Sequence, residues 1–522
     1  MLAFHPMRSL RLPSRIRAFL LIGSLTLGAL SGCAIGSEDI AHWKQTQKGP
    51  EKIVKVLTSE RYPIELRAEA AFALIELDRT DVAGLHELGL ALDQLSASEP
   101  EAVAAILRDL EPRVGAMIAG KEGEPATASQ IRGKDAAFRL VGYADGAVKD
   151  KLVEHVVGFY VADFPGRSLA GDASAEQVAQ KLGDPAVVRL VDAMSAKMPP
   201  EALVKLGELV ASLGSAETKQ KAGERLVAIE REMEGDDFVA WMKQEITAQQ
   251  PAGAEPMDEA RLAAMASLNR EKFLNQGALA AMKPLAGEAV VASRLLEIAG
   301  AKPAADAPEV VVEVTNDRRK TALIALEGKT TPAQVDALLA IALDPEDALE
   351  VRDLAFDRVA DTKSTDAIAK LWPLVQSAAN QDLAKRLRWR AGELVLGLGG
   401  PAVVDEFLAK LPARAGVEFE PEELFGYATV IAGMDPVPLQ AMRAALRGTW
   451  PRAVIVARVL ADAGEAADRE LLEQLAASKV AVSGKGWDRL EPEQKTVGDV
   501  ANAASAKLGA RLSGNSDEPS GS

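Results

Sequence analysis

A helical unit built around an arginine recurs along this chain. In the clearest copy, Arg67 is followed by Ala70 three residues later and by Leu74 seven residues later. The apolar side chains of this copy fall on one face of a helix: Leu66, Ala70, Ala73, Leu74 and Leu77. The same spacing begins at Arg319, Arg352 and Arg388, which are 33 and 36 residues apart. A period of this size predicts an all-α chain of stacked helical hairpins, an α-solenoid.

The repeated residues resemble those of the HEAT-repeat family, an armadillo-like class of α-solenoids. The resemblance is carried by Leu66-Arg67-x-x-Ala70-Ala71-x-Ala73-Leu74, Val351-Arg352-x-x-Ala355 and Leu387-Arg388-x-x-Ala391. It implies that Arg67, Arg352 and Arg388 are structural and pair with acidic residues of nearby repeats. Between about Gly146 and Met257 the motif is degraded, and TPR-like or irregular helical hairpins remain alternatives there.

Helix boundaries fit this organisation. Thr331-Pro332-Ala333-Gln334 has the pattern of a capping box, and 344–347 (Asp-Pro-Glu-Asp) is typical of a turn between helices. Gly399-Gly400-Pro401 is expected to end one helix and open the next. The stretch 248–256 is rich in Ala, Gln, Gly and Pro, and 301–308 is rich in Ala and Pro; both indicate connectors. Because 310–314 (Val-Val-Val-Glu-Val) favours β-structure, it predicts an extended connector or a short strand.

The N-terminal segment has the pattern of an export signal. Four arginines precede a short apolar run at 18–30, which is shorter than the roughly 20 residues that span a bilayer. Leu30-Ser31-Gly32-Cys33 then resembles the lipobox of bacterial lipoproteins, and Cys33 is the only cysteine of the chain. The resemblance implies a diacylglycerol on the Cys33 thiol and cleavage before it; the alternative is an ordinary leader with an incidental cysteine. By the same resemblance, Ala34 favours sorting to the periplasmic face of the outer membrane, with another bacterial membrane surface as the alternative.

Charge narrows the classes of partner. The formal net charge is −16, and the leader carries four arginines with no acidic residue, so the mature chain stands near −20. Since neutralisation of phosphates by Lys and Arg supplies much of the affinity for nucleic acid, this balance disfavours a nucleic-acid partner. It also disfavours docking onto anionic lipid, so membrane attachment is expected through the lipid at Cys33. We expect envelope proteins with basic patches as partners.

The sequence predicts six segments. These are a signal peptide at 1–32, a lipidated cysteine and tether at 33–48, an N-terminal helical repeat region at 49–248, a linker at 249–256, a C-terminal HEAT-like repeat region at 257–512 and a disordered tail at 513–522. A mature chain of this length exceeds what one compact core accommodates, which favours two segments of solenoid.

No motif predicts a catalytic or metal site. His86-Glu87 begins like a zinc-protease helix motif, but Leu90 stands where the second histidine is needed. Gly328-Lys329-Thr330 resembles the end of a phosphate loop without its first glycine, and 397–402 fits a dinucleotide fingerprint without the strand that should precede it. We therefore expect no cofactor, no metal ion and no enzymatic activity.

The expected function is a noncatalytic, membrane-anchored scaffold or adaptor that binds proteins in the cell envelope. Trp389 and Arg390 are candidate protein-binding residues, because tryptophan and arginine are enriched at binding hot spots; partly buried packing of Trp389 is the alternative. Two other functions stay open. One is a lyase-like or peptide-modifying enzyme on a HEAT-like fold, and the other is a structural spacer between membrane and cell wall.

Overall fold

The computed structural model describes residues 35–77, 83–120, 124–251, 255 and 257–514. Every regular element in these ranges is helical, and their β-type pairing is an isolated bridge between Ala481 and Thr496. The predicted all-α class is confirmed, with helices packed in neighbouring pairs as in a solenoid. No helix in these ranges combines the length and apolarity needed to cross a membrane. Cys33 lies outside the described residues.

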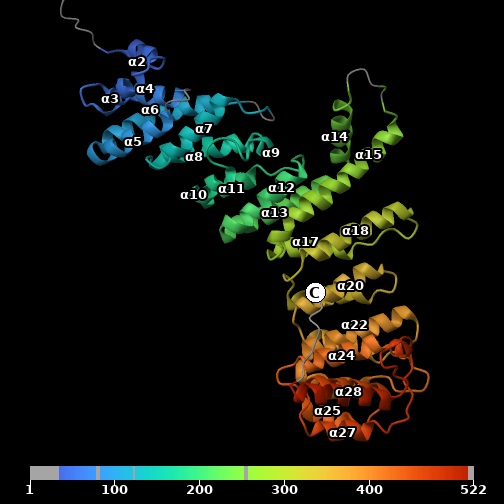
Figure 1. Cartoon of the computed structure of the whole chain (residues 1–522). Coiled ribbons are helices and arrows are strands. Elements are labelled where there is room, and N and C mark those ends of the chain that lie inside the picture. Colours follow the sequence, from blue (N-terminus) through green and yellow to red (C-terminus); the bar gives the residue numbers. More distant parts are fainter. Residues whose placement is uncertain (1–34, 78–82, 121–123, 252–254, 256, 515–522) are drawn as a thin grey trace, which may run out of the picture. The chain divides into compact units, whose positions relative to one another are not determined.

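The chain divides into two compact units, Met1–Ala193 and Met194–Ser522. In the first, the helices are α2 (Ser37–Trp43), α3 (Gly49–Thr58), α4 (Ile64–Glu76), α5 (Gly84–Ser98), α6 (Pro100–Ile118), α7 (Ala128–Leu140), α8 (Gly146–Val161), α9 (Phe164–Arg167), α10 (Ala175–Leu182) and α11 (Asp184–Asp192). Here α3 pairs with α4, and α6 packs between α4 and α8 (Figure 1). Fully buried Ala70 and Ala71 on α4 leave room for close packing of neighbouring helices.

The first part of the second unit contains α12 (Pro200–Leu213), α13 (Ala216–Glu234), α14 (Asp236–Ala248), α15 (Glu259–Lys272), the π-helix η1 (Phe273–Leu279), α16 (Ala280–Met282), η2 (Lys283–Leu285), α17 (Ala289–Gly300) and α18 (Glu309–Ala325). The remainder contains η3 (Pro332–Gln334), α19 (Val335–Leu343), α20 (Leu349–Asp361), α21 (Asp366–Val375), α22 (Asp382–Gly399), η4 (Gly400–Val403), α23 (Val404–Lys410), α24 (Pro421–Ala432), α25 (Leu439–Ala445), α26 (Trp450–Ala463), α27 (Asp468–Leu475), η5 (Trp487–Arg489) and α28 (Val497–Leu512).

Two rows of helices form this second unit from α17 onward. In one row, α17, α19, α21, α23 and α25 each contact the next, and in the other α18, α20, α22, α24, α26 and α28 do the same. Figure 1 shows α18, α20, α22 and α24 one beneath the other, from yellow to orange. Because each hairpin buries its apolar faces against its neighbours, the core runs between the rows.

Several helix boundaries follow from local chemistry. Thr331 and Gln334 form the predicted capping box, with the Thr331 amide donating to Gln334 Oε1 at 2.8 Å. The 344–347 segment joins α19 to α20, as predicted. Helix α22 ends at Gly399, and Gly400 turns the chain with φ of 58° and ψ of −150°, a conformation that only glycine adopts readily.

The prediction for 310–314 was wrong. These residues form the first turns of α18, which begins at Glu309 directly after Pro308. Pro308 directs the chain into the helix, and the acidic Glu309 suits its N-terminal end. Farther along the same helix, Ala322 and Leu323 are fully buried. Packing of this distal half therefore sets the conformation of the whole segment and overrides its weak local β-preference.

Three of the predicted segments, the tether, the linker and the tail, can be compared with the helix boundaries. The predicted tether includes α2, whose Ile40 is buried against α3 and α4. The predicted linker at 249–256 lies inside the second unit, between α14 and α15, whereas the two compact units divide at Ala193. Helix α28 ends at Leu512, and only the first two residues of the predicted tail belong to the described part.

The helix that follows the predicted linker changes its geometry along its length. It runs as α15, widens into the π-helix η1 and continues as α16. At this point Gly207 of α12 faces Ala281, and a Cβ added to Gly207 would lie 2.6 Å from the Ala281 carbonyl oxygen. Contact with backbone this close requires glycine. Helix α16 is thus held against α12, on which η1 also packs, while α15 extends beyond these contacts.

Candidate functional site

The three repeat arginines predicted to be structural, Arg67, Arg352 and Arg388, each donate to a backbone carbonyl, and Arg319 does the same. Three carbonyls lie at the end of the preceding helix: Arg67 Nε donates to Leu57 at 2.8 Å, Arg319 Nε to Ala299 at 2.7 Å and Arg352 Nε to Ala342 at 3.0 Å. Arg388 Nη1 donates at 3.1 Å to Ser377, two residues beyond the end of α21. The last carbonyls of a helix lack intrahelical donors, and a cation is favourable there. All four side chains are buried.

Three of these arginines also reach a carboxylate near the start of a later helix. Arg67 Nη1 donates to Glu99 at 2.8 Å, Arg319 binds Asp347 through both Nη atoms at 2.9 and 2.7 Å, and Arg388 binds Glu423. Arg352 has no ion pair within the described residues, because Asp347 in its own hairpin is held by Arg319. Burial lowers the pKa of Arg352. These buried contacts join successive helices and leave little surface for a ligand.

Trp389 and Arg390 lie on α22 and are both half-buried. The Trp389 Nε1 donates to Glu393 Oε1 at 2.8 Å, and Arg390 forms an ion pair with Asp357 of α20. Arg390 and Asp357 also line a cavity of about 490 Å³ between α20 and α22, which Trp389 does not line. The two candidates therefore do not form one exposed cluster.

A buried lysine in the first unit, Lys134, uses all its hydrogen-bond donors within the protein. Lys134 Nζ lies 2.5 Å from Asp135 Oδ1, 2.8 Å from the carbonyl oxygen of Ala170 and 2.9 Å from that of Ala173. An ammonium has three donors, so all of them are used. Lys134 ties the 170–173 loop to α7, and no donor remains for a substrate.

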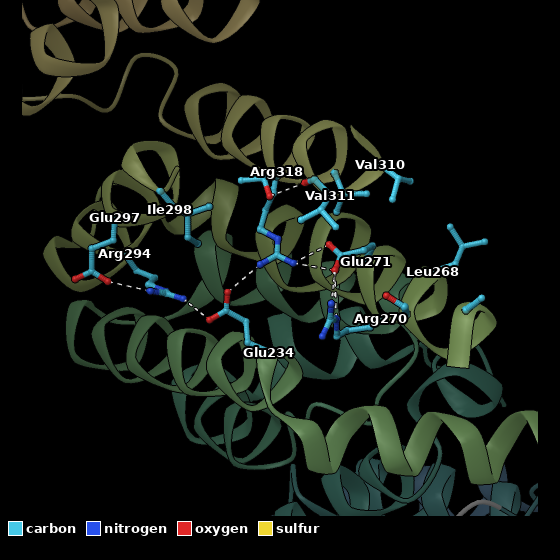
Figure 2. A pocket seen from close by; sticks show the side chains of 15 residues that line it. Glu234, Leu268, Arg270, Glu271, Arg294, Glu297, Ile298, Val310, Val311 and Arg318 are labelled. Carbon is cyan, nitrogen blue, oxygen red and sulfur yellow. Dashed lines mark hydrogen bonds and ion pairs between the residues drawn. The ribbon is translucent and has the colours of Figure 1, made fainter. Parts of the chain in front are cut away.

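A cleft of the second unit lies among α13, α15, α17 and α18 and has a volume of about 530 Å³. Figure 2 shows that one end of the cleft is charged and the other is apolar. Ion pairs centred on Arg294 and Arg318 occupy one end and the floor, and Leu268, Val310 and Val311 lie at the other. Its lining comes from residues that are far apart in the chain, which the solenoid stacking brings together.

Arg318 of α18 connects two different helices across the floor of this cleft. Its Nη1 donates to Glu234 of α13 at 2.8 Å, and its Nη2 donates to both oxygens of Glu271 of α15, at 2.9 and 2.7 Å. Arg270 also donates to Glu271, at 3.2 and 3.1 Å. Charge-assisted bonds of this kind are among the strongest in proteins, so Arg318 fixes α15 relative to α13.

Arg294 of α17 is the second centre of the network. It binds Glu230 through Nε and Nη2 at 2.8 and 3.1 Å, Glu234 at 2.8 Å and Glu297 at 3.0 Å. Burial raises the pKa of the Glu230 carboxyl, against the opposing effect of the Arg294 hydrogen bond. Burial tends to lower the pKa of Arg294, but its carboxylate partners raise it overall. The arginine therefore stays charged.

The open end of the cleft exposes apolar side chains to solvent. Leu268 of α15 is 71% exposed, and Val310 and Val311 of α18 are 64% and 44% exposed. An apolar group that is accessible beside a polar rim is typical of a surface that binds a protein or a ligand. Within the described residues, no three His, Cys, Asp or Glu side chains are grouped so that they could hold a metal ion.

Comparison with known proteins leaves the chain without a family assignment: no protein-family model matches it, and no curated protein matches its sequence.

This cleft was not among the sites predicted from the sequence. Its charged residues sit on ordinary helical faces, and nothing in their spacing brings Glu234, Glu271 and Arg318 together. One signal was present in the Val310–Val314 run. Four valines in five residues cover too much of a helix circumference for a single buried stripe, so a helix there had to expose some of them.

Proposed function

We propose that this protein is a noncatalytic scaffold of the bacterial cell envelope, anchored to a membrane through a lipid on Cys33. The lipobox and the HEAT-like arginine units support the anchor and the architecture. The observation that carries the binding function is the exposed apolar end of the α15–α18 cleft, where Leu268 and Val310 meet a polar rim. A partner protein that covers these side chains removes apolar surface from water, which drives association.

The outer membrane is the proposed location, on the periplasmic face. Ala34 after the lipobox cysteine supports this sorting, and the acidic balance of the chain supports protein partners over nucleic acid or anionic lipid. In this arrangement the lipid sets where the scaffold resides, and the cleft selects what it holds there.

Site-specific crosslinking in cells tests the proposal. A photoreactive amino acid replaces Val311 in the cleft or, as a matched control, Ile324 on the same helix; both native side chains are 44% exposed, and Ile324 does not line the cleft. We expect one defined envelope protein to be captured from position 311 and not from 324. We also expect this capture to be lost in a Cys33→Ala variant. Equal capture from both positions, or none from 311, would refute the function.

A further inference from the structure

The cleft leaves a helix without its expected neighbour. In the row that begins with α18, each inner helix packs against one helix on either side. Helix α18 packs on α20 on one side, and on the other it contacts η1 and α16, but α15 does not pack closely along it. The N-terminal part of α18, which carries Val310 and Val311, therefore faces α15 across the open cleft (Figure 2).

Both walls of the cleft present stripes with helical spacing. On α15 the lining residues are Ala264, Ser267, Leu268 and Glu271, and on α18 they are Val310, Val311, Val314 and Arg318. Positions three and four apart lie on the same face of a helix, so each wall is one continuous stripe. From residue 310 to 318 the stripe on α18 is about 12 Å long, or roughly two turns. Such a slot between two helical faces matches a third helix.

The charges in the cleft select the polarity of the occupant. The Arg294 and Arg318 side chains are only 14% and 18% exposed, and carboxylates already bind both. Glu297, in contrast, is 52% exposed and uses Oε2 for its bond to Arg294. Glu297 Oε2 also forms an ion pair with Arg231 at 3.7 Å, whereas within the described residues no hydrogen bond to Oε1 is formed. Among the charged residues that line the cleft, Glu297 is the most exposed, ahead of Glu234 at 37% and Arg270 at 27%. The most accessible charge is thus a carboxylate, which favours an incoming cation.

We infer that the cleft binds an amphipathic helix of a partner protein, with its apolar face on Leu268, Val310 and Val311 and a Lys or Arg directed at Glu297. This inference rests on the proposed scaffold function and specifies its partner. The net charge of −16 acts in the same sense, because it favours encounter with a basic segment. An acidic helix would have to displace Glu234 or Glu271 from their arginines before it gained a partner.

The test uses the full mature chain in detergent and a fluorescein-labelled peptide about four helical turns long. The peptide carries Leu at helical spacing on one face, Lys on the opposite face and Ala elsewhere. A second peptide has Glu in place of every Lys, and a third scrambles the first so that its apolar face is lost. Fluorescence anisotropy measures binding. We expect the Lys peptide to bind and the other two to bind at least about tenfold more weakly.

Variants locate the binding within the cleft. Leu268→Gln and Val310→Gln are each expected to weaken binding of the Lys peptide by about tenfold, because each replaces apolar contact with an amide. Ile324→Gln on the same helix is the matched control and should leave the affinity unchanged. Glu297→Lys should weaken the Lys peptide and strengthen the Glu peptide. Absence of Lys-peptide binding, or equal effects at 268 and 324, would overturn the inference.

The inference and the proposed function fail in different ways. A protein captured from position 311 through an acidic or an extended segment would keep the scaffold function and overturn the amphipathic helix. Capture of a second copy of this chain, or of a lipid, would also overturn it. Mass spectrometry of the crosslinked segment distinguishes these outcomes.

Discussion

Arg388 and Glu423 form a buried, two-point ion pair that joins α22 to α24. The Nε and Nη2 atoms of Arg388 donate to the two carboxylate oxygens of Glu423, at 2.7 and 2.8 Å. The Tyr427 hydroxyl lies 3.0 Å from Glu423 Oε1 and from the Arg388 backbone oxygen, and the Phe419 ring centre lies 4.1 Å from the guanidinium. Burial raises the pKa of Glu423, although Arg388 opposes this effect. The pair is therefore held by its geometry within an environment that excludes water.

Removal of Arg388 should destabilise the protein strongly. Arg388→Ala leaves the buried Glu423 carboxylate without its cation, which typically costs about 3–5 kcal/mol. Arg386→Ala on the same helix is the control: Arg386 is 52% exposed and pairs with Asp353, so its loss should cost no more than about 1 kcal/mol. Urea-induced unfolding measures both. Similar losses for the two variants would show that the buried pair has no special role in stability.

The arginine spacing explains why this part of the fold could be predicted. Arg319, Arg352 and Arg388 recur with the period of a hairpin, and each one donates to a carbonyl at or just beyond the end of the preceding helix. A repeat buries the same positions each time, so its pattern survives in the sequence. The identity of the carboxylate partner could not be predicted: Asp347 lies in the hairpin of Arg352 yet binds Arg319.

The burial of Glu230 makes stability depend on pH. Its pKa is raised in the folded state, mainly by burial, whereas an unfolded Glu titrates near a pKa of about 4.3. Above that value the unfolded chain has lost its proton while the folded state still binds it. The stabilising contribution is therefore complete below the unfolded pKa and is lost as the pH rises through the folded pKa.

A Glu230→Gln variant isolates this effect. Gln cannot titrate, so the free energy of unfolding of the unsubstituted protein should fall relative to that of the variant as the pH rises from about 4 to about 7. Urea-induced unfolding across this range gives the difference at each pH. If the free energy of unfolding of the unsubstituted protein instead rose relative to that of the variant with increasing pH, the attraction of Arg294 would outweigh burial.

Glycine at position 400 is expected to be required by the backbone. Gly400→Ala forces a Cβ into a conformation with φ of 58° and ψ of −150°, which costs about 1–3 kcal/mol. Gly397→Ala, three residues earlier within α22, is the control. An added Cβ there meets no atom within 4 Å, so the variant should gain about 0.5–1 kcal/mol of helix stability. Thermal unfolding should therefore move in opposite directions for the two variants.

The cleft could not be predicted because it depends on distances between helices. Leu268 and Val310 belong to helices separated by α17 in the chain, and their exposure follows from the way α15 departs from α18 beyond the π-helix. Neither the departure nor the π-helix has a local sequence signal comparable with the capping box at Thr331. Local signals set helix ends, whereas the space between helices results from packing over the whole unit.

Arg318 should control how firmly α15 is held at the cleft. It connects Glu234 of α13 to Glu271 of α15, so Arg318→Gln removes a charge-assisted link between the two helices. Loss of such bonds to partly buried carboxylates costs about 1.5–3 kcal/mol, equivalent to at least about tenfold faster hydrogen exchange in a locally opening segment. We expect this increase in the amides of α15, measured by mass spectrometry.

Lys320→Gln on the same helix is the control for Arg318→Gln. Lys320→Gln removes an ion pair with Asp317 within α18 itself, so it should leave exchange in α15 unchanged. Exchange in α20, on the other side of α18, should also stay the same in Arg318→Gln, because the buried C-terminal half of α18 still packs there. If the amides of α15 exchanged equally slowly with and without Arg318, the prediction would be wrong. Packing of η1 on α12 would then suffice to hold α15, without the ion pairs of Arg318.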